Sequence, residues 1–240
     1  MSGTCLRSRG QIRAARAELQ RRHLGYEPPL MARLLTSIGL PSKWRFGDWL
    51  KSWDVLQTAK FLEENLPRDA SVLDLGAYGS EILWVLSTLG FENVYGIDLD
   101  PRVASMQLPG RAKLEVGDFY QTPFDPKRFD AVTAISVIEH GYRQRELFAE
   151  VSRLLRPGGC FIASFDFWPE KLDTAGMDLF GMDWRIFSAR EVESMLECAL
   201  GFGLVPVGEV NLQIERPVIH WGGKSYTFAW VVLTKHGQRT

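Results

Sequence analysis

Hydrophobic and polar positions follow two different periods along the chain from residue 53 onward. Residues 54–65 (DVLQTAKFLEEN) carry apolar side chains at helical spacing, and Pro67 follows as a stop. Segments 80–89 and 144–155 are also predicted as helices, the first ended by Gly90. Between and around them, short segments have the pattern of strands, namely 71–76, 94–98, 113–116, 130–135 and 160–165.

The order of these elements predicts the fold class. Strands separated by helices pair in parallel through right-handed crossovers. Residues 188–200 are expected to form a further helix, with Ser188 and Glu191 as its capping box. Segments 203–210 and 226–234 follow as strands with no helix between them. The prediction is an α/β protein with a doubly wound, mostly parallel seven-stranded sheet and a terminal antiparallel hairpin.

The first 52 residues have a different pattern. Residues 1–24 contain six arginines and one acid, Glu18, which predicts a mobile arm or a surface helix, with a targeting role as an alternative. The aromatic residues that follow are expected either to cover a site as a lid or to pack against the sheet; they are Trp44, Phe46, Trp49 and Trp53. We therefore divide the chain into an N-terminal extension and partial lid, 1–52, and a main domain, 53–240.

Composition narrows the class of protein. The 240 residues include 28 Lys plus Arg against 29 Asp plus Glu, a net charge of −1, so tight nonspecific binding to nucleic acid is not expected. No apolar run is long enough for a membrane span, and the N-terminus lacks the apolar stretch of a signal peptide, which favours a cytoplasmic protein. Cys5, Cys160 and Cys198 lack CxxC spacing, so neither disulfides nor a zinc site are expected.

Candidate chemistry lies in the loops that follow the strands, where open parallel sheets bind ligands. Gly76 follows the first strand and lets a ligand approach the backbone. Asp98 ends the second strand, 22 residues beyond Gly76, where a carboxylate can accept hydrogen bonds from ribose hydroxyls. Asp118 and Phe119 follow the third strand and offer an acceptor and an apolar surface for a flat ring. Together with residues 136–140 they predict a nucleoside pocket.

This series resembles the class I S-adenosylmethionine-dependent methyltransferase superfamily over about residues 53–240. The family turn D-x-G-x-G-x-G begins at Asp74, but its second and third glycines fall on Tyr78 and Ser80, with a glycine displaced to Gly79. Asp130 and the turn Arg156-Pro157-Gly158-Gly159 also match places in the family pattern. The resemblance implies S-adenosylmethionine as cofactor, S-adenosylhomocysteine as product, and these cofactor contacts: Asp74, Gly76, Ala77, Tyr78, Gly79, Asp98, Leu99, Asp118, Phe119 and Ser136.

The acceptor side offers three candidate catalytic residues. His140 follows the fourth strand and is our first candidate for a general base, titrating near about pH 6.5 when unperturbed; a loop or capping role is the alternative. Asp166 is expected to orient His140, bind a substrate hydroxyl or cap a turn, and His220 to reach over the site from the last hairpin or only shape its rim. The connection 166–187 is expected to wall the acceptor pocket.

Glu139-His140 resembles part of the E-x-x-E-H cluster of metal-dependent relatives. Ser136 stands at the first Glu position, so no metal is expected. We expect methyl transfer to an oxygen or nitrogen of a small metabolite, with a sugar or secondary metabolite favoured. The alternatives are an RNA or protein methyltransferase, for which the basic arm is the support, and a noncatalytic S-adenosylmethionine-binding protein. A nicotinamide enzyme is disfavoured because G-x-G-x-x-G is absent. No membrane partner is expected, and a homo-oligomer stays an open alternative.

Overall fold

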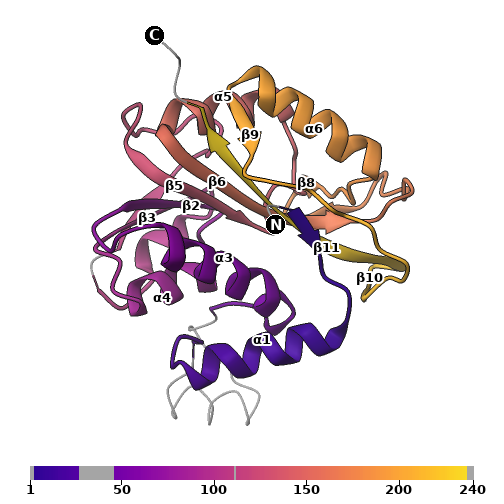
Figure 1. Ribbon diagram of the computed structural model, residues 1–240, viewed down its shortest axis with the longest axis horizontal. Helices are drawn as coiled ribbons and strands as arrows, with labels where there is room; N and C mark the ends of the chain where they lie inside the picture. Colours follow the sequence, from indigo (N-terminus) through magenta and orange to yellow (C-terminus); the bar gives the residue numbers. More distant parts are fainter. Residues whose placement is uncertain (1–2, 27–45, 111, 237–240) are drawn as a thin grey trace.

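A computed structural model describes residues 3–26, 46–110 and 112–236 of the chain. Its main sheet has the spatial order β4-β3-β2-β5-β6-β11-β1 (Figure 1). The strands β4 (Lys113–Val116), β3 (Asn93–Asp98), β2 (Ser71–Leu75), β5 (Phe129–Ile135) and β6 (Leu155–Phe167) pair in parallel. β11 (Lys224–Lys235) runs antiparallel to β6. This arrangement confirms the predicted fold class.

Helices cover both faces of this sheet (Figure 1). α1 (Arg9–Arg21), α3 (Ser52–Asn65) and α4 (Glu81–Thr88) pack into one buried apolar cluster, and α5 (Gln144–Leu154) and α6 (Ala189–Gly201) into the other. Along β2, Val72 belongs to the first cluster and Leu73 to the second, because successive side chains of a strand point to opposite faces. The inner parallel strands β2, β3 and β5 are thus buried on both sides, which explains their short continuous apolar runs, whereas the edge strand β4 is mostly exposed.

The C-terminal strands differ in extent from the sequence prediction. The strand expected at 203–210 is shortened to β9 (Leu204–Pro206), which pairs antiparallel with β11. The tight hairpin is formed instead by β10 (Ile219–Trp221) and β11, which pair antiparallel across Gly222 and Gly223. Both glycines have positive φ, the conformation that a two-residue hairpin turn of this kind requires.

The N-terminal segment forms a short strand and a surface helix, the second of the two expected alternatives. β1 (Gly3–Cys5) pairs with the middle of β11, on the side opposite β6. α1 buries Ile12, Ala15 and Leu19 completely or nearly so and contacts α3. Three apolar residues are enough to pack the helix against the rest of the fold, because they lie on one narrow face of it, at intervals of three and four residues. The Ser8–Gln11 capping box fixes where this helix begins.

The connection between β6 and α6 is tied to the loop that follows β5. Within it, β7 (Asp178–Leu179) and β8 (Met182–Asp183) form a small hairpin. The Gly141 amide donates to the Asp183 carbonyl at 2.9 Å, and the Arg185 amide donates to the Glu139 carbonyl at 2.8 Å. These hydrogen bonds hold the hairpin beside the carboxyl end of β5, where the site is expected. No helix among the described residues has the length and apolar character that crossing a membrane requires.

Candidate donor and acceptor site

A cavity of about 890 Å³ lies at the carboxyl ends of the parallel strands. Its floor comes from the loops after β2, β3 and β5 and from the end of β6. One wall is the β7–β8 hairpin, which contributes Leu179, Phe180 and Met182. The other sides are closed by residues 47–51, which include the short 3-10 helix η1 (Trp49–Lys51), and by the β10–β11 hairpin. The cavity therefore gathers segments from the whole chain at one edge of the sheet.

At one end of the cavity, Asp98 closes β3 and binds two backbone amides. Its Oδ2 accepts a hydrogen bond from the Tyr78 amide at 2.8 Å, and its Oδ1 accepts one from the Asp100 amide, also at 2.8 Å. The first bond joins the loop after β2 to the end of β3. The carboxylate is partly exposed and lines the cavity, so its remaining lone pairs can accept further hydrogen bonds.

The loop after β2 follows a path that its glycines allow. Gly76 has φ +69°, and a Cβ there would lie 2.4 Å from Val137 Cγ2, so a larger residue would need both the backbone and Val137 to move. Gly79 also has positive φ. Tyr78 stands at a position where the family pattern has glycine, and its ring lies 4.4 Å from the Arg102 guanidinium. Leu99 is exposed beside this loop and lines the cavity.

Asp74 supports this loop from beneath and does not line the cavity. Its Oδ1 accepts a hydrogen bond from Thr133 Oγ1 at 2.6 Å, which links β2 to β5. The side chain is buried, and this burial raises its pKa from 3.8 to about 7. Ala77, on the same loop, is completely buried. Ala77, like Asp74, does not line the cavity.

Of the two candidate residues that follow β4, only Phe119 lines the cavity, and Asp118 does not. Phe119 lines the cavity with its ring largely buried, as a surface for a flat ring would. Asp118 points elsewhere: its Oδ1 accepts from the Tyr120 amide at 2.8 Å, and its Oδ2 accepts from Arg143 Nη2 at 2.7 Å. Ser136 lines the cavity with positive φ, and its amide donates to the Ser164 carbonyl at 2.9 Å.

The other end of the cavity contains His140. Its ring lies edge-on to Phe180, with centroids 5.3 Å apart. Burial, together with the positive charge of Lys51, lowers the pKa of His140 from 6.5 to about 4. Its Nδ1 has no hydrogen-bond partner among the described residues. A neutral imidazole with an unpaired nitrogen is therefore present at neutral pH, which is the form that accepts a proton.

Asp166 lies in the same end but contacts other partners than His140. Its Oδ2 accepts a hydrogen bond from Trp184 Nε1 at 2.8 Å, and its Oδ1 lies 3.7 Å from Lys51 Nζ. The structure gives no hydrogen bond between Asp166 and His140, so the expected orienting contact is absent from this geometry. Burial raises the pKa of Asp166, while Lys51 opposes that shift.

His220, the third catalytic candidate, is not among the residues that line the cavity. It lies in β10, where Ile219 and Trp221 on either side of it do line the cavity. Successive residues of a strand point to opposite faces, so this placement directs His220 away. Its Nδ1 lies 2.9 Å from Ser225 Oγ across the hairpin, which fits the alternative that it shapes the turn.

Sequence reasoning missed Lys51 and Asp54, and it considered Glu139 only as part of a possible metal cluster. Lys51 Nζ also stands 3.5 Å from the centroid of the Phe228 ring. Glu139 lines the cavity with 1% of its surface exposed, and Asp54, on α3, is completely buried and accepts a hydrogen bond from Ser164 Oγ at 2.8 Å. A signal existed for Asp54, a charged residue within the buried face of a helix. Lys51 offered none, because its place depends on the turn that precedes α3.

The aromatic residues of the extension divide between packing and exposure. Phe46 packs against Tyr26 and Trp84, with ring centroids 4.9 Å apart for the Tyr26–Phe46 pair; the Tyr26–Trp84 pair has the same separation. Trp53 is buried in the core, whereas Trp49 is 52% exposed. Trp44 lies outside the described residues. Because Gly47, Asp48, Leu50 and Lys51 line the cavity, this segment has the position of a partial lid, which stays a prediction.

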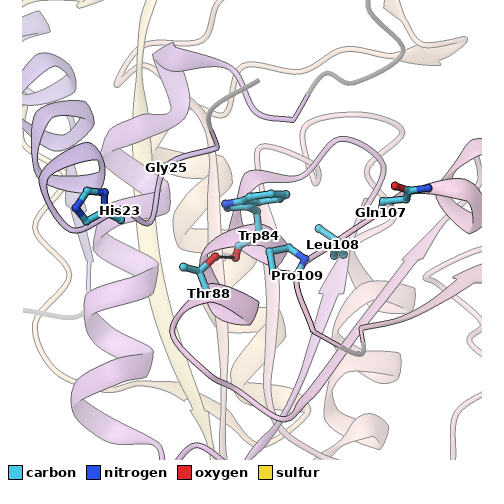
Figure 2. A pocket seen from close by; sticks show the side chains of 7 residues that line it. All are labelled: His23, Gly25, Trp84, Thr88, Gln107, Leu108 and Pro109. Carbon is cyan, nitrogen blue, oxygen red and sulfur yellow. Dashed lines mark hydrogen bonds between the residues drawn. The ribbon is translucent and has the colours of Figure 1, made fainter. Parts of the chain in front are cut away.

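A second, shallower hollow of about 620 Å³ lies at the end of α1 and along α4 (Figure 2). Trp84 and Thr88 come from α4, and Thr88 Oγ1 donates to the Trp84 carbonyl at 2.8 Å. Leu108 and Pro109 face them from the segment that precedes β4. None of the expected site residues lines this hollow, so we assign the candidate site to the larger cavity.

Comparison with known proteins shows which part of the chain is similar to methyltransferases. A family profile described as a methyltransferase domain matches residues 73–163, which include the donor loop, Asp98 and His140. EEF1A lysine methyltransferase 2 of Homo sapiens is 29% identical over 129 residues, 45% of this chain and 52% of that protein. The sarcosine/dimethylglycine N-methyltransferase of Aphanothece halophytica is 31% identical over 107 residues, 41% of this chain and 39% of that protein. The chain spans about half or less of the length of the curated relatives it matches.

Solved structures show the same fold. The structure of geranyl diphosphate C-methyltransferase from Streptomyces coelicolor A3(2) superposes with a TM-score of 0.56 at 18% identity, covering 89% of this chain and 95% of that one. This likeness extends beyond the matched profile to most of the sheet. Together with that profile and the strand order, it shows the Rossmann-like fold of S-adenosylmethionine-dependent methyltransferases, with a methyltransferase domain matched over residues 73–163.

Proposed function

We propose that the chain transfers a methyl group from S-adenosylmethionine to an oxygen or nitrogen atom of a small molecule, with a sugar or secondary metabolite as the favoured acceptor class. One observation carries this proposal: a single cavity joins the Asp98 end to the His140 end. A nucleoside held at Asp98 and an acceptor beside His140 would share one enclosed space, as direct transfer between them requires.

The residues at the Asp98 end fit the donor. Asp98 is partly exposed, and each of its oxygens, which already accepts one amide hydrogen bond, has a further lone pair for a ribose hydroxyl. Phe119 offers an apolar face beside it, and Gly76 removes any side chain from the backbone that the donor would approach. S-adenosylmethionine, when bound, supplies a methyl group already activated by its sulfonium charge.

The protein then has to position the acceptor and remove its proton. His140 is the group we assign to the proton, because it lines the acceptor end of the cavity and is neutral at physiological pH, although its lowered pKa makes it a weaker base than a free imidazole. The β7–β8 hairpin and Trp184 limit access of water to this end. Asp166 fixes Trp184 through its 2.8 Å hydrogen bond and so shapes the wall.

The aromatic end of the cavity supports a small acceptor over a macromolecular one. A cavity of about 890 Å³ is of the size that holds a cofactor and a small ligand, and Phe180, Trp184 and Trp221 border it. The basic arm, which supported an RNA acceptor, uses two of its arginines internally: Arg16 pairs with Glu81, and Arg22 pairs with Glu63. These charges are therefore engaged within the fold.

The test is a transfer assay with methyl-labelled S-adenosylmethionine against a panel of hydroxylated and amino-bearing small molecules, read by mass spectrometry. The proposal expects one panel member to gain a single labelled methyl group and His140→Ala to lose most of this activity. A protein that binds S-adenosylhomocysteine but transfers no label to any small molecule, and does label RNA or protein, would overturn it.

A further inference from the structure

The acceptor end of the cavity holds more negative than positive groups. Asp54, Glu139 and Asp166 are each at most 4% exposed, and Lys51 is the cation that faces them. Burial raises the pKa of all three carboxyl groups, so without a further cation the site favours their protonated forms; when all are ionised, three carboxylates against one ammonium leave a formal surplus of two negative charges. Buried carboxylates need an opposite charge or hydrogen-bond donors to be stable, and here the described residues supply too few.

Each of these carboxyl groups also has an oxygen without a hydrogen bond among the described residues. The atoms are Asp54 Oδ1, Glu139 Oε2 and Asp166 Oδ1. Glu139 and Asp166 line the cavity, whereas Asp54 lies behind them and is held by Ser164. The Glu139 carboxyl is the clearest case, because no described side chain donates a hydrogen bond to it and burial raises its pKa well above the usual value.

Aromatic rings surround the same space. Trp184 packs edge-on against Trp221 and Tyr226, with centroids 5.2 and 5.7 Å away. Lys51 shows what such a place binds: its Nζ stands 3.5 Å from the centre of the Phe228 ring and 3.7 Å from Asp166 Oδ1. The chain thus already holds one ammonium group between a ring and a carboxylate here, an arrangement that favours cations over neutral groups.

We propose that the acceptor carries a basic nitrogen, bound as an ammonium group by Glu139 and Asp166 within this aromatic end of the cavity. The inference rests on the proposed function for the identity of the site and narrows its substrate class to amino-bearing small molecules. An ammonium group supplies both missing components at once, a positive charge and up to three N–H donors. A hydroxyl group would satisfy one oxygen and leave the surplus charge in place.

The experiment compares two probes of one shape, phenethylamine and 2-phenylethanol, by calorimetric or NMR titration, with and without S-adenosylhomocysteine. We expect the amine to bind roughly tenfold or more tightly than the alcohol. Glu139→Gln should reduce this preference to near unity, because it keeps the shape of the side chain and removes its charge. Glu115→Gln, an exposed change on β4, is the matched control and should leave the preference intact.

A second variant moves the result in the opposite direction. Lys51→Met removes the ammonium group that faces these carboxyl groups and should increase the preference for the amine, even where Glu139→Gln fails to fold. Equal binding of amine and alcohol to wild type, or a preference that neither variant alters, would overturn the proposal. Failure of the proposed function appears separately, as a lack of S-adenosylhomocysteine binding, since the probe titrations are also run without it.

Discussion

Lys51 shows how strongly one residue can determine the chemistry of this site. Its ammonium lies against Asp166 and the Phe228 ring, and its charge lowers the pKa of His140 in addition to the effect of burial. Nothing in the sequence distinguishes Lys51 from the other lysines, because its position arises from the 3-10 turn that precedes α3. Residue roles that depend on such a turn are visible only in three dimensions.

At the same scale, His140 gives a pH prediction that differs from the one its sequence suggests. With a pKa of about 4, the imidazole is neutral across the physiological range, so we expect the single-turnover rate to be flat with respect to His140 ionisation from about pH 6 to 8. The rate should fall only as the pH drops toward 4, where the base becomes protonated. His140→Ala should lower the rate by about 10² to 10⁴. A limb near pH 6.5, or His140→Gln equal to wild type, would contradict this role.

Asp74 gives a stability prediction, because its folded pKa of about 7 lies above the unfolded value near 3.8. The folded protein then binds this proton more tightly, so the contribution is present below about pH 4 and is lost as the pH rises through 7. Asp74→Asn removes this loss and keeps an oxygen that can accept from Thr133. Between about pH 4 and pH 7, we expect the free energy of unfolding of the variant to rise relative to that of wild type by up to about 1.4 kcal/mol per pH unit. The measurement is urea unfolding of both proteins at a series of pH values. If the free energy of unfolding depends on pH in the same way in both, the prediction is wrong.

Elements differ in how far their sequence reveals them. The helix at 188–200 was predicted with its capping box, which the structure shows at Ser188 and Glu191, because a helix of this length carries a clear period and a cap. β1 and β10 were not predicted, since three residues are too few to show any period. Both depend on β11 as a template, so their existence is a property of tertiary pairing.

α1 is the element that links the extension to the donor loop. Arg16 forms two hydrogen bonds to Glu81, at 2.6 and 2.7 Å, and Glu81 is the first residue of α4. Glu81 Oε1 also accepts from the Tyr26 amide at 3.1 Å, and the Gly47 amide donates to the Gly79 carbonyl at 2.7 Å. The described parts of the extension thus hold the loop after β2 at its far side.

Breaking this tie should destabilise the protein. Arg16→Met leaves the nearly buried Glu81 carboxylate without its cation, and we expect a loss of about 3 kcal/mol in the free energy of unfolding. Affinity for S-adenosylhomocysteine should also fall, because the loop loses a support. Arg13→Met, at an exposed position of the same helix, is the matched control and should change stability by less than about 0.5 kcal/mol. Equal losses of stability in Arg16→Met and Arg13→Met would contradict a stabilising role of the Arg16–Glu81 ion pair.

At the scale of the whole molecule, the sheet order and the site at its carboxyl edge were predictable, because alternation of strands and helices admits few topologies. The end of the cavity that we propose for the donor is marked by the glycine and the acid that follow β2 and β3. The acceptor end was not resolved to the same depth: Asp166 lies in it without contacting His140 by a hydrogen bond, and His220 faces elsewhere. Those differences come from contacts between distant segments, which periodicity and motif spacing do not encode.

The measurement that tests the central claim most directly is calorimetric titration of the protein with S-adenosylhomocysteine, using wild type, Asp98→Ala and Asp125→Ala. Asp125 is an exposed acid that precedes β5 at the opposite end of the sheet, so it serves as the control. The account predicts binding to wild type and to Asp125→Ala with similar affinity, and a loss of roughly ten- to a hundredfold in Asp98→Ala, since charge-assisted hydrogen bonds contribute about 1.5 to 3 kcal/mol each. No binding to wild type, or equal affinity in all three proteins, would contradict it.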